Sequence, residues 1–194
     1  MRRQTACASN LHQIGLAIKM YLSDHDDRFA DRRELKTYLG FHPWGGWPPS
    51  DPRGGWAGIV FSNDVAHEAV WNCPGVGPRL SEAAPVAQPS RPGDNASLVT
   101  YWLWRFDRNE DPVPLDNFWG KTPEQSLQDL RAANNPQAGQ PDSLADVELV
   151  VDVYFPATIP SVEPSLSGRA AHSRGRNRLM LDGHVEFTRD LRLR

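Results

Sequence analysis

The chain has 194 residues, of which 39% are hydrophobic, and a formal net charge of −3 at pH 7. This length predicts one domain, or one domain with an appended element, and the weak negative charge argues against a nucleic-acid partner. No apolar run approaches the roughly 20 residues that span a bilayer, and no secretory signal is present. The chain as given is therefore expected to be soluble.

The first segment is predicted to be an amphipathic helix. Its apolar residues recur at three- and four-residue spacing over about four turns. The helix is expected to end before Asp24, and Gly15 is either a weak point or a place of close approach to another element. The apolar stripe consists of Cys7, Leu11, Ile14, Ile18, Tyr21 and Leu22.

Capping patterns predict two further helices. Asp31 as N-cap and Glu34 three residues later form a capping box, and Gly40 suits the position just after the helix. A second box at 122–125, with proline at the first helical position, opens a short helix that runs toward Asn134. Both helices are expected to lie in the part of the chain that follows the long N-terminal helix.

Between the helices the chain favours loops and strands. Residues 41–58 are rich in proline and glycine, which predicts an irregular loop. Its tryptophans Trp44, Trp47 and Trp56 either cover the core or form an aromatic binding surface. Residues 58–61, 98–104 and 147–155 are expected to be strands, the second of them central and the last carrying Asp152.

The C-terminal segment is predicted to form a β-hairpin around Asp182-Gly183. Asp-Gly between two β-prone runs is typical of a two-residue type I′ turn, which requires positive φ at both residues. This closure predicts Met180 opposite Val185, with Met180, Val185 and Phe187 on one face of the hairpin. Together these elements predict an α+β fold: an N-terminal helix packed on an antiparallel sheet, with long loops.

One polar constellation is a candidate site: His172, Asp182 and His184, joined by Asp152 from a neighbouring strand. Imidazole and carboxylate groups suit Zn²⁺ or another divalent transition metal, and the same groups can support acid–base chemistry. A purely structural role is the simplest interpretation, because Asp182 suits the turn and His172 can donate to Asp152 or Asp182. No catalytic motif is present, so no enzyme activity and no resident cofactor other than this metal are expected.

Three patches of sequence resemble a known family. They are residues 2–17 with the Tyr21, Asp24 and Phe29 that follow, the Val70-Trp-Asn-Cys-Pro74 segment, and His172 followed after nine residues by Asp182-Gly183. Together they are similar to the pilin-like proteins (pseudopilins) of type II secretion and type IV pilus systems, in the group with a prepilin-type N-terminus and a C-terminal H-X9-DG domain. The patches cover the two ends of the chain and leave its long middle unmatched.

The resemblance implies a structural subunit that acts in protein transport by assembly and protein–protein contact. Residues 1–29 are then the lower part of the pilin-like helix, and residues 30–194 the globular α+β head. The implied partners are other pilin or pseudopilin subunits, without a small-molecule ligand. The residues expected to make assembly contacts are Leu11, Ile14, Ile18, Tyr21 and Leu22.

The resemblance also implies an extracytoplasmic head, anchored by an apolar segment that family members carry before this helix. This chain begins at Met1, where that segment would end, so it is a shortened form, an incompletely called gene or a soluble relative. The alternative function is a soluble extracytoplasmic metal-binding protein or hydrolase that uses the histidine and aspartate residues named above.

Cys7 and Cys73 are too few for a disulfide framework and lack the spacing of a zinc motif. A bridge between them and two buried thiols are both compatible with the sequence. The extracytoplasmic location that the resemblance implies would permit the bridge. Closing the loop of 65 intervening residues would stabilise the fold by roughly 4 kcal/mol.

Overall fold

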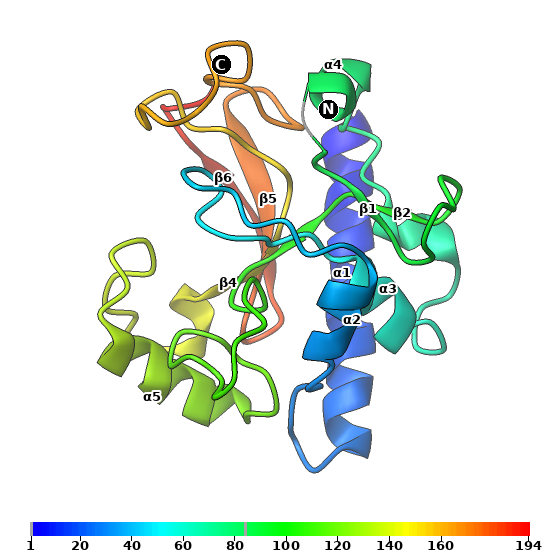
Figure 1. The fold of residues 1–194 in the computed structure, drawn as a ribbon, viewed down its shortest axis with the longest axis vertical. Coiled ribbons are helices and arrows are strands. Elements are labelled where there is room, and N and C mark those ends of the chain that lie inside the picture. Colours follow the sequence, from blue (N-terminus) through cyan, green and yellow to red (C-terminus); the bar gives the residue numbers. More distant parts are fainter. Residues whose placement is uncertain (1, 84) are drawn as a thin grey trace.

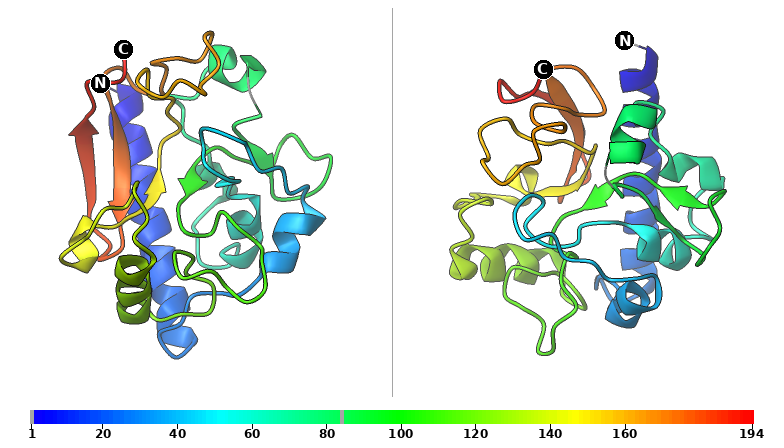
Figure 2. Two further views of the ribbon diagram at one scale, coloured as in Figure 1. Left: turned by 60° about the vertical axis from the view of Figure 1, so that its left-hand side comes forward. Right: turned by 45° about the horizontal axis from the view of Figure 1, so that its top comes forward.

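The long helix α1 (Arg2–Asp24) runs beside the main sheet in the computed structural model, which describes residues 2–83 and 85–194. It contacts strands β5 (Gly175–Met180) and β6 (Val185–Arg189) along its length, as Figures 1 and 2 show. A Cβ on Gly15 would lie 2.9 Å from Cδ1 of Leu179, so this glycine lets helix and strand approach closely. The predicted helix is confirmed. No helix in the described residues is long and apolar enough to cross a bilayer.

The main sheet is antiparallel and has four strands in the order β3-β4-β5-β6. Strand β3 (Trp102–Leu103) lies at one edge, and β4 (Glu148–Val151) pairs with both β3 and β5. Strands β1 (Gln88–Pro89) and β2 (Leu98–Val99) form a separate two-stranded sheet. The fold is therefore mixed helix and antiparallel sheet, as predicted at the level of fold class.

The hairpin is present, but its predicted register is wrong by one residue. Val185 pairs with Leu179, not with Met180, so Met180 lies on the opposite face from Val185 and Phe187. Only Gly183, at φ +94°, has positive φ in the turn, and its N–H donates to the Met180 carbonyl at 2.8 Å. This is a three-residue loop, a type I turn followed by a left-handed glycine, which shifts the pairing relative to a two-residue loop.

The second predicted helix forms, but its capping box does not. Helix α2 (Arg33–Tyr38) has Arg32 as its N-cap residue, without a side-chain cap. The Asp31 carboxylate instead accepts from the Arg33 guanidinium at 2.7 and 3.0 Å. Gly40, at φ +91°, follows the helix in the left-handed conformation that glycine adopts without steric cost.

Helix α5 (Pro123–Ala133) agrees with its predicted ends. The Thr122 hydroxyl accepts from the Gln125 N–H at 3.2 Å, and Asn134 closes the helix in the left-handed region at φ +50°. The remaining helical segments are short. They are α3 (Gly55–Val60), the 3₁₀ turns Glu68–Trp71 and Leu144–Asp146, and α4 (Pro78–Ala83).

The predicted strands are shorter than expected or replaced. Residues 58–61 fall mostly in α3, so that strand was wrong. The 98–104 strand splits into β2 and β3 because Thr100 turns toward the chain near Cys73: its N–H donates to the Trp71 carbonyl at 3.0 Å. Strand β4 ends at Val151, although the Asp152 N–H still donates to the Asn177 carbonyl at 3.1 Å.

The tryptophans of loop 41–58 mainly cover the core. Trp47 and Trp56 are buried, and the indole N–H of Trp47 donates to the Tyr154 carbonyl at 2.8 Å. Trp44 is half-buried, with the Arg53 guanidinium 5.2 Å from its ring centre. The large aromatic side chains thus take the place of regular secondary structure in holding this loop against the sheet.

Candidate functional site

The structure divides the four predicted metal-site residues between two places. Asp152 and His172 lie close together near the start of β5, where His172 forms a bridge with Gly175. Asp182 and His184 lie in the turn after the other end of that strand. Six strand residues span about 20 Å, so the predicted single site is not formed.

A disulfide between Cys7 and Cys73 lies beside Asp152 and His172, where Asp182 and His184 had been predicted. Cys7 lies on the buried face of α1, and Cys73 follows the 3₁₀ turn Glu68–Trp71. Both cysteines are fully buried, with their Cα atoms 5.1 Å apart. The sequence was compatible with a disulfide or with two free thiols, and the structure contains the disulfide. It joins the N-terminal helix to the rest of the fold.

The imidazole of His172 lies between the disulfide and a carboxylate. Its Nε2 atom is 3.6 Å from Sγ of Cys73 and 3.3 Å from Oδ2 of Asp152. The possible ligand atoms of Cys7, Cys73, Asp152 and His172 all lie within 4.8 Å of one another. We call these four residues the buried cluster.

Main-chain contacts hold the members of the buried cluster in place. Oδ2 of Asp152 accepts from the Asn177 N–H at 2.7 Å, which ties the carboxylate to β5. The Cys73 N–H donates to the Thr100 hydroxyl at 2.7 Å. The cluster is therefore built from α1, a loop and two neighbouring strand ends, and each part is anchored to a different element.

The cluster is polar but shielded from solvent. Asp152 is fully buried, and within the part of the chain that the structure describes its Oδ1 has no hydrogen-bond partner. Burial, and next the nearby Asp152 charge, raise the pKa of Tyr101. The Tyr101 hydroxyl donates to the Cys7 carbonyl at 3.4 Å, which adds a contact between the cluster and α1. A buried carboxylate with a free oxygen favours a proton donor or a cation beside it.

Asp182 and His184 form an exposed pair that stabilises the turn. Oδ1 of Asp182 lies 2.6 Å from Nδ1 of His184 and accepts from its main-chain N–H at 3.0 Å. Burial opposes ionisation of Asp182, but these hydrogen bonds outweigh it and lower the pKa of that carboxyl. The structural role predicted for Asp182 agrees with this geometry.

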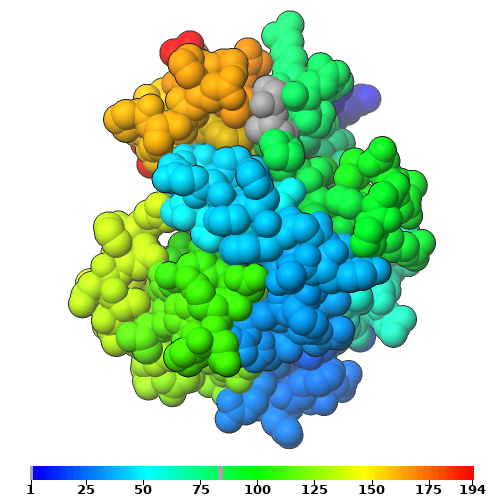
Figure 3. All heavy atoms as spheres, in the orientation of Figure 1, coloured from blue at the N-terminus to red at the C-terminus, as the bar shows by residue number. Residues whose placement is uncertain are grey.

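A cavity of about 500 Å³ lies elsewhere, between β4, β5 and the segment 136–138. Figure 3 shows a surface gap between the cyan loop 41–50 and the yellow-green segment near residue 137. All four arginines of its lining form ion pairs. Arg176 pairs with Glu148 and Asp190, and Arg178 pairs with Glu148 and Glu186. Arg192 pairs with Asp190. The lining of this cavity comes from separate parts of the chain, so no local sequence pattern predicts it.

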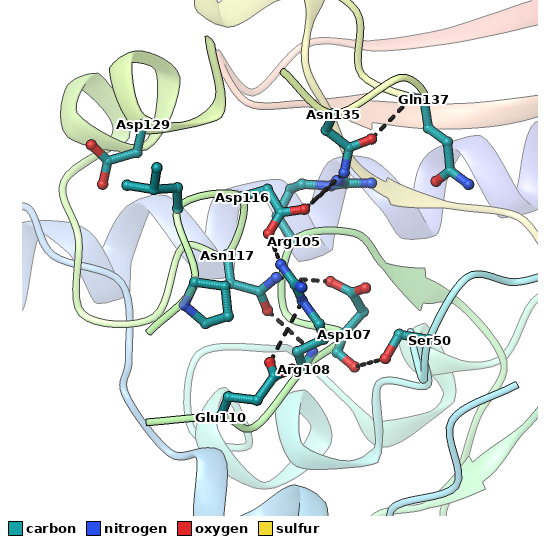
Figure 4. A network of polar contacts seen from close by, with 12 residues as sticks. Ser50, Arg105, Asp107, Arg108, Glu110, Asp116, Asn117, Asp129, Asn135 and Gln137 are labelled. Atoms are coloured by element: carbon teal, nitrogen blue, oxygen red, sulfur yellow. Dashed lines mark hydrogen bonds and ion pairs between the residues drawn. The ribbon is translucent and has the colours of Figure 1, made fainter. Parts of the chain in front are cut away.

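Arg105 is the least typical residue of the cavity wall. It is buried, its backbone φ is +66°, and burial lowers the pKa of its guanidinium. Its Nη1 lies 3.9 Å from Oδ2 of Asp116, which also accepts from the Asn135 amide at 2.8 Å. Figure 4 shows this network, in which Arg108 binds the other oxygen of Asp116. The Asp116 carboxylate thus contacts both Arg105, which lines the cavity, and Arg108.

Four of the five predicted assembly residues on α1 are buried within the chain itself. Leu11, Ile14, Ile18 and Leu22 are buried within the chain, and Tyr21 is half-buried against His25 and Phe61. The large apolar residues that α1 exposes are Leu16 and Met20, which are 62% and 51% exposed. Four residues apart, they lie on the same face of the helix, away from the sheet.

Comparisons of the sequence with protein-family models and with curated proteins, and of the fold with solved structures, find no match.

Proposed function

We propose that this chain is a pseudopilin-like structural subunit of a type II secretion or type IV pilus-like machine. The main support is the position of α1, which lies lengthwise on an antiparallel sheet with its N-terminal end at the edge of the molecule (Figure 2). An apolar segment placed before Arg2 would continue this helix away from the head. The sequence resemblance at both ends of the chain supports the same function.

The outer face of α1 supplies the surface for assembly in this proposal. Leu16 and Met20 are exposed, and both lie on the helix that pilin-like subunits use for contact. The partner is the α1 helix of a neighbouring copy, since two such helices can bury these side chains against each other. The five residues Leu11, Ile14, Ile18, Tyr21 and Leu22 would instead hold the helix on its own head.

The disulfide is consistent with an extracytoplasmic head. Structural disulfides persist in oxidising compartments and are rare in reducing ones. The bridge would also keep the lower helix attached to the head while the upper helix is held in a filament. A hydrolase that uses Asp152 and His172 has less support, because both side chains are buried and a substrate has no direct access to them.

The first test is the genomic sequence immediately upstream of the Met1 codon. We expect an in-frame basic leader followed by about 20 apolar residues. A stop codon directly upstream would contradict a membrane-anchored subunit.

The second test is photo-crosslinking in the full-length gene product, with the photoreactive residue at position 16 or 20. We expect crosslinks between copies from both positions. Leu115 provides the matched control, because it is also 51% exposed but lies outside the helix. Equal crosslinking from position 115, or none from 16 and 20, would overturn the proposed contact.

A further inference from the structure

The buried cluster has the atoms of a tetrahedral metal site. Typical bonds of Zn²⁺ are about 2.3 Å to sulfur and about 2.0–2.1 Å to nitrogen or oxygen. At tetrahedral angles these bond lengths place a sulfur and a nitrogen ligand about 3.6 Å apart, and a nitrogen and an oxygen ligand about 3.3 Å apart. The Cys73 Sγ to His172 Nε2 and His172 Nε2 to Asp152 Oδ2 distances are 3.6 and 3.3 Å. These two distances therefore already match those between neighbouring ligands of a zinc site, and all the possible ligand atoms of the cluster lie within 4.8 Å of one another.

The fourth position is Cys7, whose sulfur is bonded to Cys73 in the oxidised protein. A tetrahedral site needs the two sulfurs about 3.8 Å apart, which they can reach only as thiolates. Rotation of the side chains about their Cα–Cβ bonds provides such a movement without requiring α1 to leave the sheet. The same two residues thus serve either a disulfide or a pair of metal ligands.

The carboxylate of Asp152 gives independent support for a cation. It is fully buried, and its Oδ1 has no hydrogen-bond partner among the described residues. A buried carboxylate is costly unless its lone pairs are satisfied. The Asn177 N–H already binds Oδ2 and orients the group, as the second-shell contacts of metal ligands do.

We propose that the reduced chain binds one Zn²⁺ through Cys7 Sγ, Cys73 Sγ, His172 Nε2 and an Asp152 carboxylate oxygen. Two thiolates with an imidazole favour zinc over Ca²⁺ and Mg²⁺, which prefer oxygen ligands. This inference does not depend on the proposed assembly function. It replaces the exposed Asp182 and His184 of the sequence-based site with the two cysteines.

The metal and the disulfide are alternative cross-links between α1 and the rest of the fold. The chain is synthesised with thiols, and zinc binding displaces one proton from each thiol. A disulfide-bearing oxidant then converts the two thiolates to the Cys7–Cys73 bond. The oxidant accepts two electrons, is reduced to two thiolates, and the site releases Zn²⁺. In both states the N-terminal helix stays attached to the sheet.

The test compares zinc content in oxidised protein and in protein purified and kept under reducing conditions. We expect about one zinc per chain in the reduced form and none in the oxidised form. Co²⁺ added to the metal-free reduced form should give thiolate-to-cobalt charge-transfer absorption. Absence of zinc binding and of this absorption in the reduced wild-type protein would overturn the proposal without any variant.

Two variants place the site. His172→Gln and Asp152→Asn preserve side-chain size, and circular dichroism of their oxidised forms checks that they fold. Each substitution removes a side chain that would bind zinc directly, so it should weaken zinc binding in the reduced form at least about 100-fold. His184→Gln in the exposed pair is the matched control and should bind zinc as the wild type does. Unchanged affinity in both cluster variants, or an equal loss in His184→Gln, would contradict the assignment.

Discussion

Gly75 lies directly against the imidazole ring of His172. A Cβ on Gly75 would be 2.5 Å from Cε1 of His172 and 2.6 Å from the Ala171 carbonyl oxygen, and both distances are shorter than real Cβ contacts. The glycine is therefore needed for the histidine to reach Asp152 and the disulfide. Gly75 thus borders the buried cluster and leaves the space that the His172 ring occupies.

Gly75→Ala should destabilise the protein by about 1–3 kcal/mol, since the added methyl group has no space and forces the His172 segment to move. Chemical denaturation followed by circular dichroism measures this change. Gly77→Ala is the matched control, because a Cβ at Gly77 meets no atom within 4 Å. Equal stability of the two variants would show that the Gly75 contact is not restrictive.

Loss of the disulfide should cost about 4 kcal/mol of unfolding free energy, because the unfolded chain regains the freedom of a long loop. The Cys7→Ala/Cys73→Ala double variant and wild type can be compared by urea denaturation with and without a reductant, in both cases with a metal chelator so that no zinc replaces the bridge. The reductant should lower the stability of the wild type and leave the double variant unchanged. A wild-type curve that does not respond to prolonged reduction in urea would contradict a bridge in this protein.

The buried ion pair of Asp51 and Arg53 should matter more than an exposed pair of similar geometry. Arg53 binds both carboxylate oxygens of Asp51 at 2.9 Å, and the Asp51 side chain is fully buried. Asp51→Asn leaves the Arg53 charge without its partner and should cost about 3–5 kcal/mol.

Asp31 and Arg33 provide the control for this pair. They have the same sequence spacing and also form two hydrogen bonds, but the Asp31 side chain is 40% exposed. Asp31→Asn should cost less than about 1 kcal/mol. Similar losses in the two variants, measured by denaturation at neutral pH, would show that burial does not determine the strength of these pairs.

Lys36 should make stability rise with pH above neutrality. Burial lowers the pKa of its ammonium group to about 8, although the nearby Asp51 and Asp107 charges oppose the shift, and the group donates to the Asp51 carbonyl at 2.8 Å. Between this value and the unfolded pKa of about 10.4, the unfolded chain binds more protons, so higher pH favours the folded state. The expected gain from pH 7 to 9.5 is about 2 kcal/mol.

Denaturation from pH 7 to 9.5 measures this slope, and Lys36→Met should remove it. The range stops there because burial raises the pKa of Tyr101 and Tyr154, and ionisation of these tyrosines in the unfolded chain lowers stability at higher pH. Only the difference in slope between the two proteins is used, so a change in the overall stability of the variant does not affect the test. Equal slopes would contradict a lowered pKa for Lys36.

Signals between near neighbours in the chain allowed several elements to be predicted. The apolar period of α1 depends on residues within two turns, and the Thr122 cap of α5 depends on a hydrogen bond to Gln125. Asp182-Gly183 correctly marked a turn for the same reason. The positive φ of Gly40 after α2 is a further case in which one residue type suits one local conformation.

Contacts between segments that are distant in the sequence determined the hairpin register and the strand boundaries. The hairpin register depends partly on Leu181, whose N–H donates to the Val147 carbonyl at 2.8 Å, a partner that the turn sequence does not contain. The strand predicted at 98–104 is split in the same way by the Trp71 carbonyl. Local propensity cannot anticipate such bonds, because their free energy is gained only after the chain has folded.

The candidate site shows most clearly which features local sequence determines and which depend on tertiary contacts. The sequence by itself identified Asp152 and His172 as chemically suited to a metal. It grouped His172 with Asp182 and His184, which are near it in the chain, and added Asp152 from a neighbouring predicted strand. Tertiary structure separated the two pairs by the length of β5 and brought Cys7 and Cys73 to the first pair. The reason is physical: side-chain type sets which ligands a residue offers, whereas strand pairing and helix packing determine which residues come within bonding distance.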